Sequence, residues 1–214
     1  MAIIRNNRVY GVVGDVVYYT DRSGNQRTRK RPVIKVSPTD KQMGTRLKFR
    51  LGVHFLNPIR ALINTSWHVD LSRGVLPYDN ALGRLIRQSI EGEYPDLKIN
   101  YQVVQISDGK MDGPLRLSFN MEGDEAVLAW EILPWFCRAS SPDDILQIML
   151  VNEAKKSMMV FEKKALRGDL SLRIALPETF GNDELHGFFF FVNHNGKDAS
   201  ATSYRKFAKM NDQG

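Results

Sequence analysis

The sequence predicts a mainly β protein of the α+β class. An N-terminal β-ribbon and two helices precede a C-terminal antiparallel immunoglobulin/fibronectin-III-like β-sandwich. Three observations predict this arrangement: β-branched residues with turn signals open the chain, apolar residues at helical spacing follow, and short alternating segments without helices fill the second half. We expect two domains, a basic β-ribbon and helical region over residues 1–95 and the sandwich over residues 97–210.

The ribbon is predicted from strands at residues 9–13 and 16–20, a turn at residues 21–25 and a return strand at residues 26–31 that residues 33–36 extend. Gly11 and Gly14 interrupt it, as at a bulge or a close approach of two backbones. No Gly-Lys-Ser/Thr follows them, which argues against a phosphate-binding loop.

Two helices are predicted after the ribbon, at residues 39–64 and 77–90. Ser37 and Pro38 suit the start of the first helix, and Pro58 should kink or break it. Its apolar residues form two stripes, which together make a face wider than one sheet usually covers. The stripes are Met43, Leu47, Leu51, Phe55, Ile59 and Leu62, and Phe49, Val53, Leu56 and Ile63.

From residue 97 onward the pattern predicts strands. The last seven candidates match the strand number of an immunoglobulin-like domain, and Trp130 stands where such folds often place a core tryptophan. Four consecutive phenylalanines, 188–191, lie in one strand, so the helices or a second copy should cover its second face. The candidate strands are residues 99–106, 115–119, 126–132, 145–152, 158–163, 170–176, 185–193 and 202–208.

Several of these segments carry a resemblance. Residues 11–17, the basic strand ending in Arg31-Pro32 and the pattern Thr39…Gln42…Arg46…Phe49 resemble the N-terminal signature of an uncharacterised Bacteroidetes family of domain-of-unknown-function proteins. The second half is also similar, with a tryptophan strand, a Pro-Asp-Asp strand start and a late Leu-His-x-Phe strand. A related pattern in phage and prophage proteins implies, by analogy, an assembly role in a phage-like or mobile element. The resemblance implies no catalytic residues.

The chemistry-bearing residues give no enzyme pattern. The four histidines lack metal-ligand spacing, no Gly-x-Ser-x-Gly is present, and Cys137, the only cysteine, is interpreted as a small apolar residue. Asp143 and Asp144 should point to opposite faces of a strand, so we interpret them as turn formers and edge protection. A calcium site that adds Asp169 or Asp183 is the alternative. We expect no catalytic residues, no metal and no cofactor.

The composition and the first residues of the chain indicate the class of protein and the compartment in which we expect it. Hydrophobic residues make up 43% and charged residues 25% of the 214, which excludes a disordered or collagen-like chain. Arg5 precedes any apolar stretch of signal-peptide length, and no apolar run could span a bilayer. We therefore expect a cytoplasmic protein without a membrane partner, which could be incorporated into a particle.

Charge is concentrated at the N-terminus. Residues 1–60 carry 13 Lys or Arg and 3 Asp or Glu, whereas the remainder carries 17 and 21. In an extended strand, Arg27, Arg29 and Arg31 share a face and repeat every ~6.7 Å, close to the phosphate spacing of a nucleic-acid strand. Tyr10, Tyr18 and Tyr19 could stack on bases. The predicted phosphate-binding or acidic-partner site comprises Arg22, Arg27, Arg29, Lys30, Arg31, Lys35, Arg46 and Arg50.

Three interpretations of this charge stay open. It could keep a solvated hairpin soluble, bind nucleic acid, or bind an acidic protein surface, including a neighbouring subunit. The wide apolar helix face offers a second partner surface, with Leu47, Leu51, Phe55 and Ile59 as its packing residues. We expect a non-enzymatic structural or interaction protein that binds a protein partner or itself. A nucleic-acid-binding module using the ribbon is the alternative.

Overall fold

A computed structural model of the chain gives the fold. It describes residues 2–31, 37–68, 74–122, 125–132, 140–161, 165–177, 180 and 183–207. The chain divides into two compact units, Met1–Thr39 and Asp40–Gly214. The sequence placed a boundary near residue 96 and grouped the helices with the ribbon, whereas the structure groups the helices with the sandwich. Each unit is described by itself.

The N-terminal unit is a four-stranded antiparallel sheet with the order β1-β2-β3-β4. Its first hairpin closes on Asn6 and Asn7, which both have positive φ, as the type I′ two-residue hairpin turn requires. The predicted ribbon strands are confirmed, β1 was not expected, and residues 33–36 lie outside the described residues. The strands are β1 (Ala2–Arg5), β2 (Arg8–Val13), β3 (Val16–Thr20) and β4 (Gln26–Lys30).

Helices open the second unit. The predicted break at Pro58 is confirmed, because this residue lies in a short 3-10 turn between two α-helices. A Cβ on Gly52 would lie 2.8 Å from Leu82 Cδ1, so the first and third helices approach closely there. The elements are α1 (Asp40–Leu56), η1 (Asn57–Ile59), α2 (Arg60–Ser66) and α3 (Pro77–Gln88).

The segment after α3 differs from the sequence expectation. Residues 99–106 were predicted as a strand, yet only a two-stranded ladder, β5 (Ile90–Glu91) with β6 (Lys98–Ile99), forms before the turn η3 (Tyr101–Val103). The Asn100 side chain accepts a hydrogen bond from the backbone of Gln102 and caps this turn. The apolar residues that suggested a strand therefore reach the core from a turn and the segment after it.

The predicted immunoglobulin-like antiparallel sandwich is confirmed. The chain lays two strands in one sheet, two in the other, returns once to the first, and ends with two in the second. The three-stranded sheet, in the order β11-β8-β7, comprises β7 (Leu115–Glu122), β8 (Glu125–Glu131) and β11 (Ser171–Ala175). The four-stranded sheet, in the order β10-β9-β12-β13, comprises β9 (Ile145–Asn152), β10 (Ser157–Phe161), β12 (Leu185–Val192) and β13 (Ser203–Phe207).

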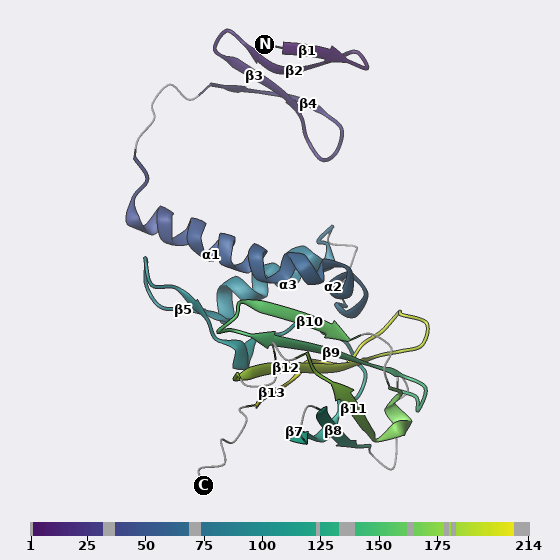
Figure 1. Cartoon of the computed structure of the whole chain (residues 1–214). Coiled ribbons are helices and arrows are strands. Elements are labelled where there is room, and N and C mark those ends of the chain that lie inside the picture. The colour runs from purple at the N-terminus through teal and green to yellow at the C-terminus, as the bar shows by residue number, and fades with distance from the viewer. Residues whose placement is uncertain are drawn as a thin grey trace. The chain divides into compact units, whose positions relative to one another are not determined.

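The four-stranded sheet is covered on both faces. Figure 1 shows α1, α2 and α3 on one side of it and β7, β8 and β11 on the other. Phe188 and Phe190 join the core under the helices, and Phe189 and Phe191 join the core of the sandwich. This alternation explains why every residue of β12 is buried. The helices provide the second cover that the four phenylalanines required.

Candidate functional site

One face of the N-terminal sheet gathers arginine and tyrosine side chains. Residues paired across antiparallel strands share a face, as do residues two positions apart along a strand. Arg27 pairs with Tyr19, and Arg29 pairs with Val17. We call this surface the arginine face. The strand register assigns to it Ile3, Arg5, Arg8, Tyr10, Val12, Val17, Tyr19, Arg27 and Arg29. Arg31 follows the end of β4 and continues the alternation, because its N–H donates to the Asp15 carbonyl across the sheet.

The charge of the arginine face is scarcely neutralised. Arg27 Nε lies 3.0 Å from Asp21 Oδ2 in the turn that joins β3 to β4. Hydrogen bonds from the Asn25 backbone and from Arg27 lower the pKa of Asp21, so it stays ionised at neutral pH. The guanidinium of Arg29 lies 5.9 Å from the centre of the Tyr19 ring. No strand of this sheet contains Asp or Glu.

The opposite side of the sheet is apolar over β1 and β2 and polar along β4. Ile4 and Val13 are 73% and 50% exposed there. The side-chain amide of Gln26 both accepts from and donates to the backbone of Val9, which ties β4 to β2. We call this surface the apolar face. It comprises Ala2, Ile4, Val9, Gly11, Val13, Val16, Tyr18, Thr20, Gln26, Thr28 and Lys30.

Neither face is covered within the N-terminal unit. None of the residues described between 2 and 31 is buried. Sheets normally gain stability by packing one apolar face against another layer. A sheet that leaves Ile4 and Val13 in water is therefore a surface suited to contact with another molecule.

The structure divides the predicted basic site. Arg27, Arg29 and Arg31 lie together on the arginine face, while Lys30 lies on the apolar face and Arg22 in the adjoining turn. Lys35 lies outside the described residues. Arg46 and Arg50 are exposed on α1, in the other unit.

Sequence reasoning missed Arg5 and Arg8, which pair directly across the first hairpin. Arg8 Nη1 also lies 3.9 Å from the Cβ position of Gly24 in the β3–β4 turn. The turn signal Asn6-Asn7 between two apolar runs could have revealed this hairpin and, with it, the pair.

The prediction that Leu47, Leu51, Phe55 and Ile59 form a partner-packing face is partly wrong. Phe55 and Ile59 are 6% and 2% exposed and belong to the core between the helices and the four-stranded sheet. They are occupied by contacts within the chain and cannot meet a partner. Leu47 and Leu51 are half-buried, and Phe49 is exposed.

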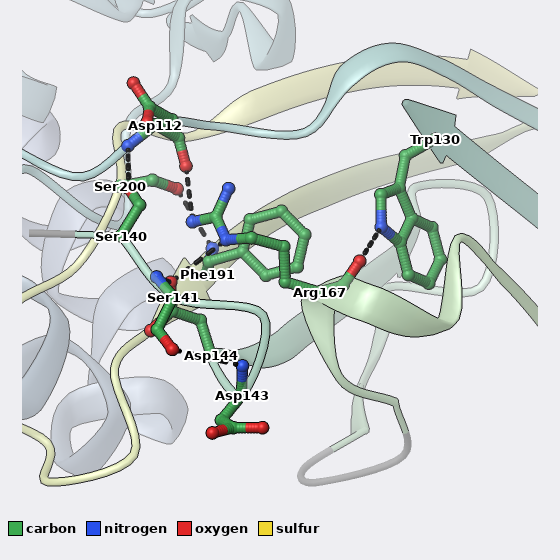
Figure 2. Close-up of polar contacts among 9 residues, drawn as sticks. All are labelled: Asp112, Trp130, Ser140, Ser141, Asp143, Asp144, Arg167, Phe191 and Ser200. Atoms are coloured by element: carbon green, nitrogen blue, oxygen red, sulfur yellow. Dashed lines mark hydrogen bonds and ion pairs between the residues drawn. The ribbon is translucent and has the colours of Figure 1, made fainter. Parts of the chain in front are cut away.

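A buried ion pair lies inside the second unit (Figure 2). Arg167 Nε donates to Asp144 Oδ2 at 2.9 Å, and Arg167 Nη2 donates to the carbonyl of Asp112 at 2.7 Å. The guanidinium lies 4.0 Å from the centre of the Phe191 ring. The Trp130 indole N–H donates to the Arg167 carbonyl at 2.9 Å, which confirms this tryptophan as a core residue.

This pair corrects one sequence interpretation. Asp143 is exposed and fits a turn-forming role, but Asp144 is fully buried. It closes the turn by accepting the Ser141 N–H at 2.7 Å and neutralises Arg167. It therefore does not protect a sheet edge.

A second titratable cluster surrounds His186, at the start of β12. Its Nδ1 lies 2.9 Å from the Tyr204 hydroxyl, and its ring stacks on Tyr101 with centres 4.2 Å apart. Burial lowers the pKa of His186, although the carboxylates of Glu153 and Glu184 lie 3.6 and 3.9 Å from Nε2 and oppose that shift. His186 is buried, with 6% of its surface exposed.

The described residues contain neither a metal-binding group of side chains nor a membrane-spanning helix. Within them, no group of three or more His, Cys, Asp or Glu side chains is arranged to hold a metal ion. Cys137 lies outside them. None of the described helices combines the length and apolar composition that crossing a bilayer requires.

A comparison with known protein families finds one whose model matches most of the chain. The model of a family of unknown function, DUF6266, matches residues 8–205. The chain belongs to this family. The DUF6266 match includes β2, β3 and β4 as well as the sandwich, so most of the arginine face lies within it.

The comparison with solved structures finds similarity to an immunoglobulin-like sandwich. One solved structure similar to the chain is a DUF3244 family protein with an immunoglobulin-like β-sandwich fold from Bacteroides vulgatus. It is 15% identical and covers 47% of this chain and 96% of its own, with a TM-score of 0.28. A search of curated proteins finds no match.

Proposed function

We propose that this DUF6266 protein is a non-enzymatic interaction protein that associates with a second copy of itself through the apolar face. The observation that carries the proposal is the exposure of Ile4 and Val13 on a sheet that buries no described residue. Water contact with such a surface is unfavourable, and a second layer removes it.

A second copy is the partner that the chemistry of this face fits best. Lys30 is its only charged residue, and it carries no carboxylate. A face without charge pattern offers nothing to a charged partner, whereas two identical apolar sheets can pack face to face around a two-fold axis. In that arrangement the arginine face of each copy stays in water.

The size of the face sets the strength of the contact. Four strands about 4.8 Å apart and about 17 Å long cover roughly 300 Å² per copy. Stable complexes commonly bury about 800 Å² per partner, so we expect weak, concentration-dependent association. Weak contacts of this kind become strong when many copies are held together. That behaviour suits an assembly component of a phage-like or mobile element, the role that the resemblance implies.

Sedimentation velocity of the full chain over a wide concentration range tests this proposal. We expect Ile4→Ser combined with Val13→Ser to abolish the concentration-dependent shift of the wild-type protein. Ile3→Ser is the matched control, because Ile3 is also exposed but lies on the arginine face. A wild-type protein that stays monomeric at the highest concentration, or a control as disruptive as the test variant, contradicts the proposal.

A further inference from the structure

We propose that the arginine face is a binding site for single-stranded nucleic acid. The site goes beyond self-association and does not depend on it, because the two contacts use opposite faces of one sheet. The argument rests on the charge of the face, its repeat along β4 and its tyrosines.

The charge is positive, exposed and largely unpaired. Within the described residues, Arg5, Arg8 and Arg29 make no salt bridge, and Arg27 alone is paired, with Asp21. Both carboxylates of the described sheet, Asp15 and Asp21, lie in turns rather than in strands. A row of unpaired guanidinium groups attracts phosphates and releases their counterions on binding.

The arginines also have a suitable repeat. Arg27, Arg29 and Arg31 follow one edge strand, and a hydrogen bond of 2.7 Å from the Arg31 N–H to the Asp15 carbonyl extends the ladder beyond β4. Alternate residues of a strand lie ~6.7 Å apart, close to the spacing of phosphates along one nucleic-acid strand. One row can therefore follow a single phosphate backbone.

The tyrosines favour nucleic acid over an acidic protein surface. Tyr10 and Tyr19 lie on the two inner strands of the arginine face, β2 and β3. Tyr19 is 42% exposed. Tyr10 also lines a hollow together with Ile3, Arg5 and Asn6. Bases that are free to leave a stack can lie on such rings, whereas the bases of a duplex are already stacked on each other. Aromatic rings beside a phosphate-binding row are thus suited to a single strand.

Fluorescence anisotropy with a labelled oligothymidine of about 20 nucleotides tests the site on the full chain. We expect binding that weakens steeply with salt. Arg29→Ala, and Arg5→Ala with Arg8→Ala, should each weaken it and reduce the log–log salt slope by about 0.7 for every phosphate that the variant no longer neutralises. Lys30→Ala is the matched control, because it removes a positive charge from the same strand on the opposite face and should leave the slope nearly unchanged.

The tyrosines give the decisive readout. Tyr10→Leu and Tyr19→Leu should each weaken oligothymidine binding roughly tenfold, since each removes a ring on which a base can stack. The same variants should bind inorganic polyphosphate, which has no bases, as the wild type does. If either leucine variant loses the sheet's amide signals in a ¹⁵N–¹H spectrum, Tyr→Phe at that position replaces it and should bind normally.

Three results overturn the proposal. The first is no oligothymidine binding at low salt. The second is that the folded tyrosine variants bind oligothymidine as tightly as the wild type does, and that polyglutamate displaces the oligonucleotide equally well from both. That result would mark a site for an acidic protein. The third is that Lys30→Ala lowers the affinity for oligothymidine as much as Arg29→Ala does. The variant Ile4→Ser with Val13→Ser should bind the strand as a monomer, so failure of self-association would leave this site standing.

Discussion

Arg167 and Asp144 meet through a 2.9 Å hydrogen bond with both side chains closed to solvent. Their backbones also join, because the Arg167 N–H donates to the Asp144 carbonyl at 2.7 Å. The pair therefore connects the turn that precedes β9 to η4 (Arg167–Asp169), the turn that precedes β11. A buried charge that loses its partner cannot regain water without opening the sandwich.

Replacing Arg167 with Met should therefore be strongly destabilising. We expect Arg167→Met to lower the free energy of unfolding by about 3–5 kcal/mol, because it leaves the Asp144 carboxylate buried and unpaired. Urea unfolding followed by circular dichroism measures this change. Asp143→Asn is the control, since Asp143 is the exposed neighbour and its change should lie within about 0.5 kcal/mol.

The same pair predicts non-additivity. The double variant Asp144→Leu with Arg167→Met removes both charges and should be more stable than Arg167→Met alone. If the two single losses simply add, the interaction does not link these residues energetically.

The stability of the fold should fall in mild acid through His186. Its folded pKa lies below that of the unfolded chain because it is buried, so the unfolded state binds the proton more readily. The contribution of neutral His186 is complete above about pH 6.5 and decreases as the pH falls from there toward the folded pKa. Glu153 and Glu184 reduce this loss and Lys206 increases it.

Thermal unfolding between about pH 7 and pH 5 checks the His186 prediction. His186→Gln should flatten the pH dependence of the melting temperature, whereas His194→Gln, at an exposed histidine, should not. An unchanged slope in His186→Gln would assign the acid sensitivity to other groups.

Two helix glycines should respond oppositely to alanine. At Gly52 the new methyl group would meet Leu82 Cδ1 at 2.8 Å, with Leu85 and Ile86 at 3.4 Å, so the Leu82 side chain must leave its packed position or the two helices must move apart. At Gly83 it would meet only the flexible end of Arg87, at 3.2 Å. We expect Gly52→Ala to destabilise by about 1–3 kcal/mol and Gly83→Ala to stabilise by about 0.5–1 kcal/mol. Shifts of the melting temperature in the same direction for both variants would contradict this account.

Local patterns predicted the sandwich well. Strands such as residues 145–152 carry β-branched and aliphatic residues between clear turn signals, and the structure gives these bounds unchanged. The strand expected at residues 99–106 failed because Asn100 caps a turn, a local hydrogen bond that apolar spacing does not reveal. β1 was missed because it is only four residues long, although the Asn6-Asn7 turn that follows it is a hairpin signal.

The surfaces were harder to predict, because they depend on register. The sequence placed Arg27, Arg29 and Arg31 on one face, but only the pairing of four strands adds Arg5 and Arg8 to them. The pairing also moves Lys30 to the other side. The ion pair of Asp144 with Arg167 joins residues 23 positions apart, beyond any local pattern.

The sheet of β9 and β12 serves two cores at once, and this has a consequence for fragments of the chain. A fragment beginning at residue 97 would keep every strand of the sandwich yet expose Met149, Val151, Phe188 and Phe190, which the helices now cover. Such a piece would be prone to aggregation. The unit that can be prepared intact should begin at residue 40, and its helices and strands should melt in a single cooperative transition.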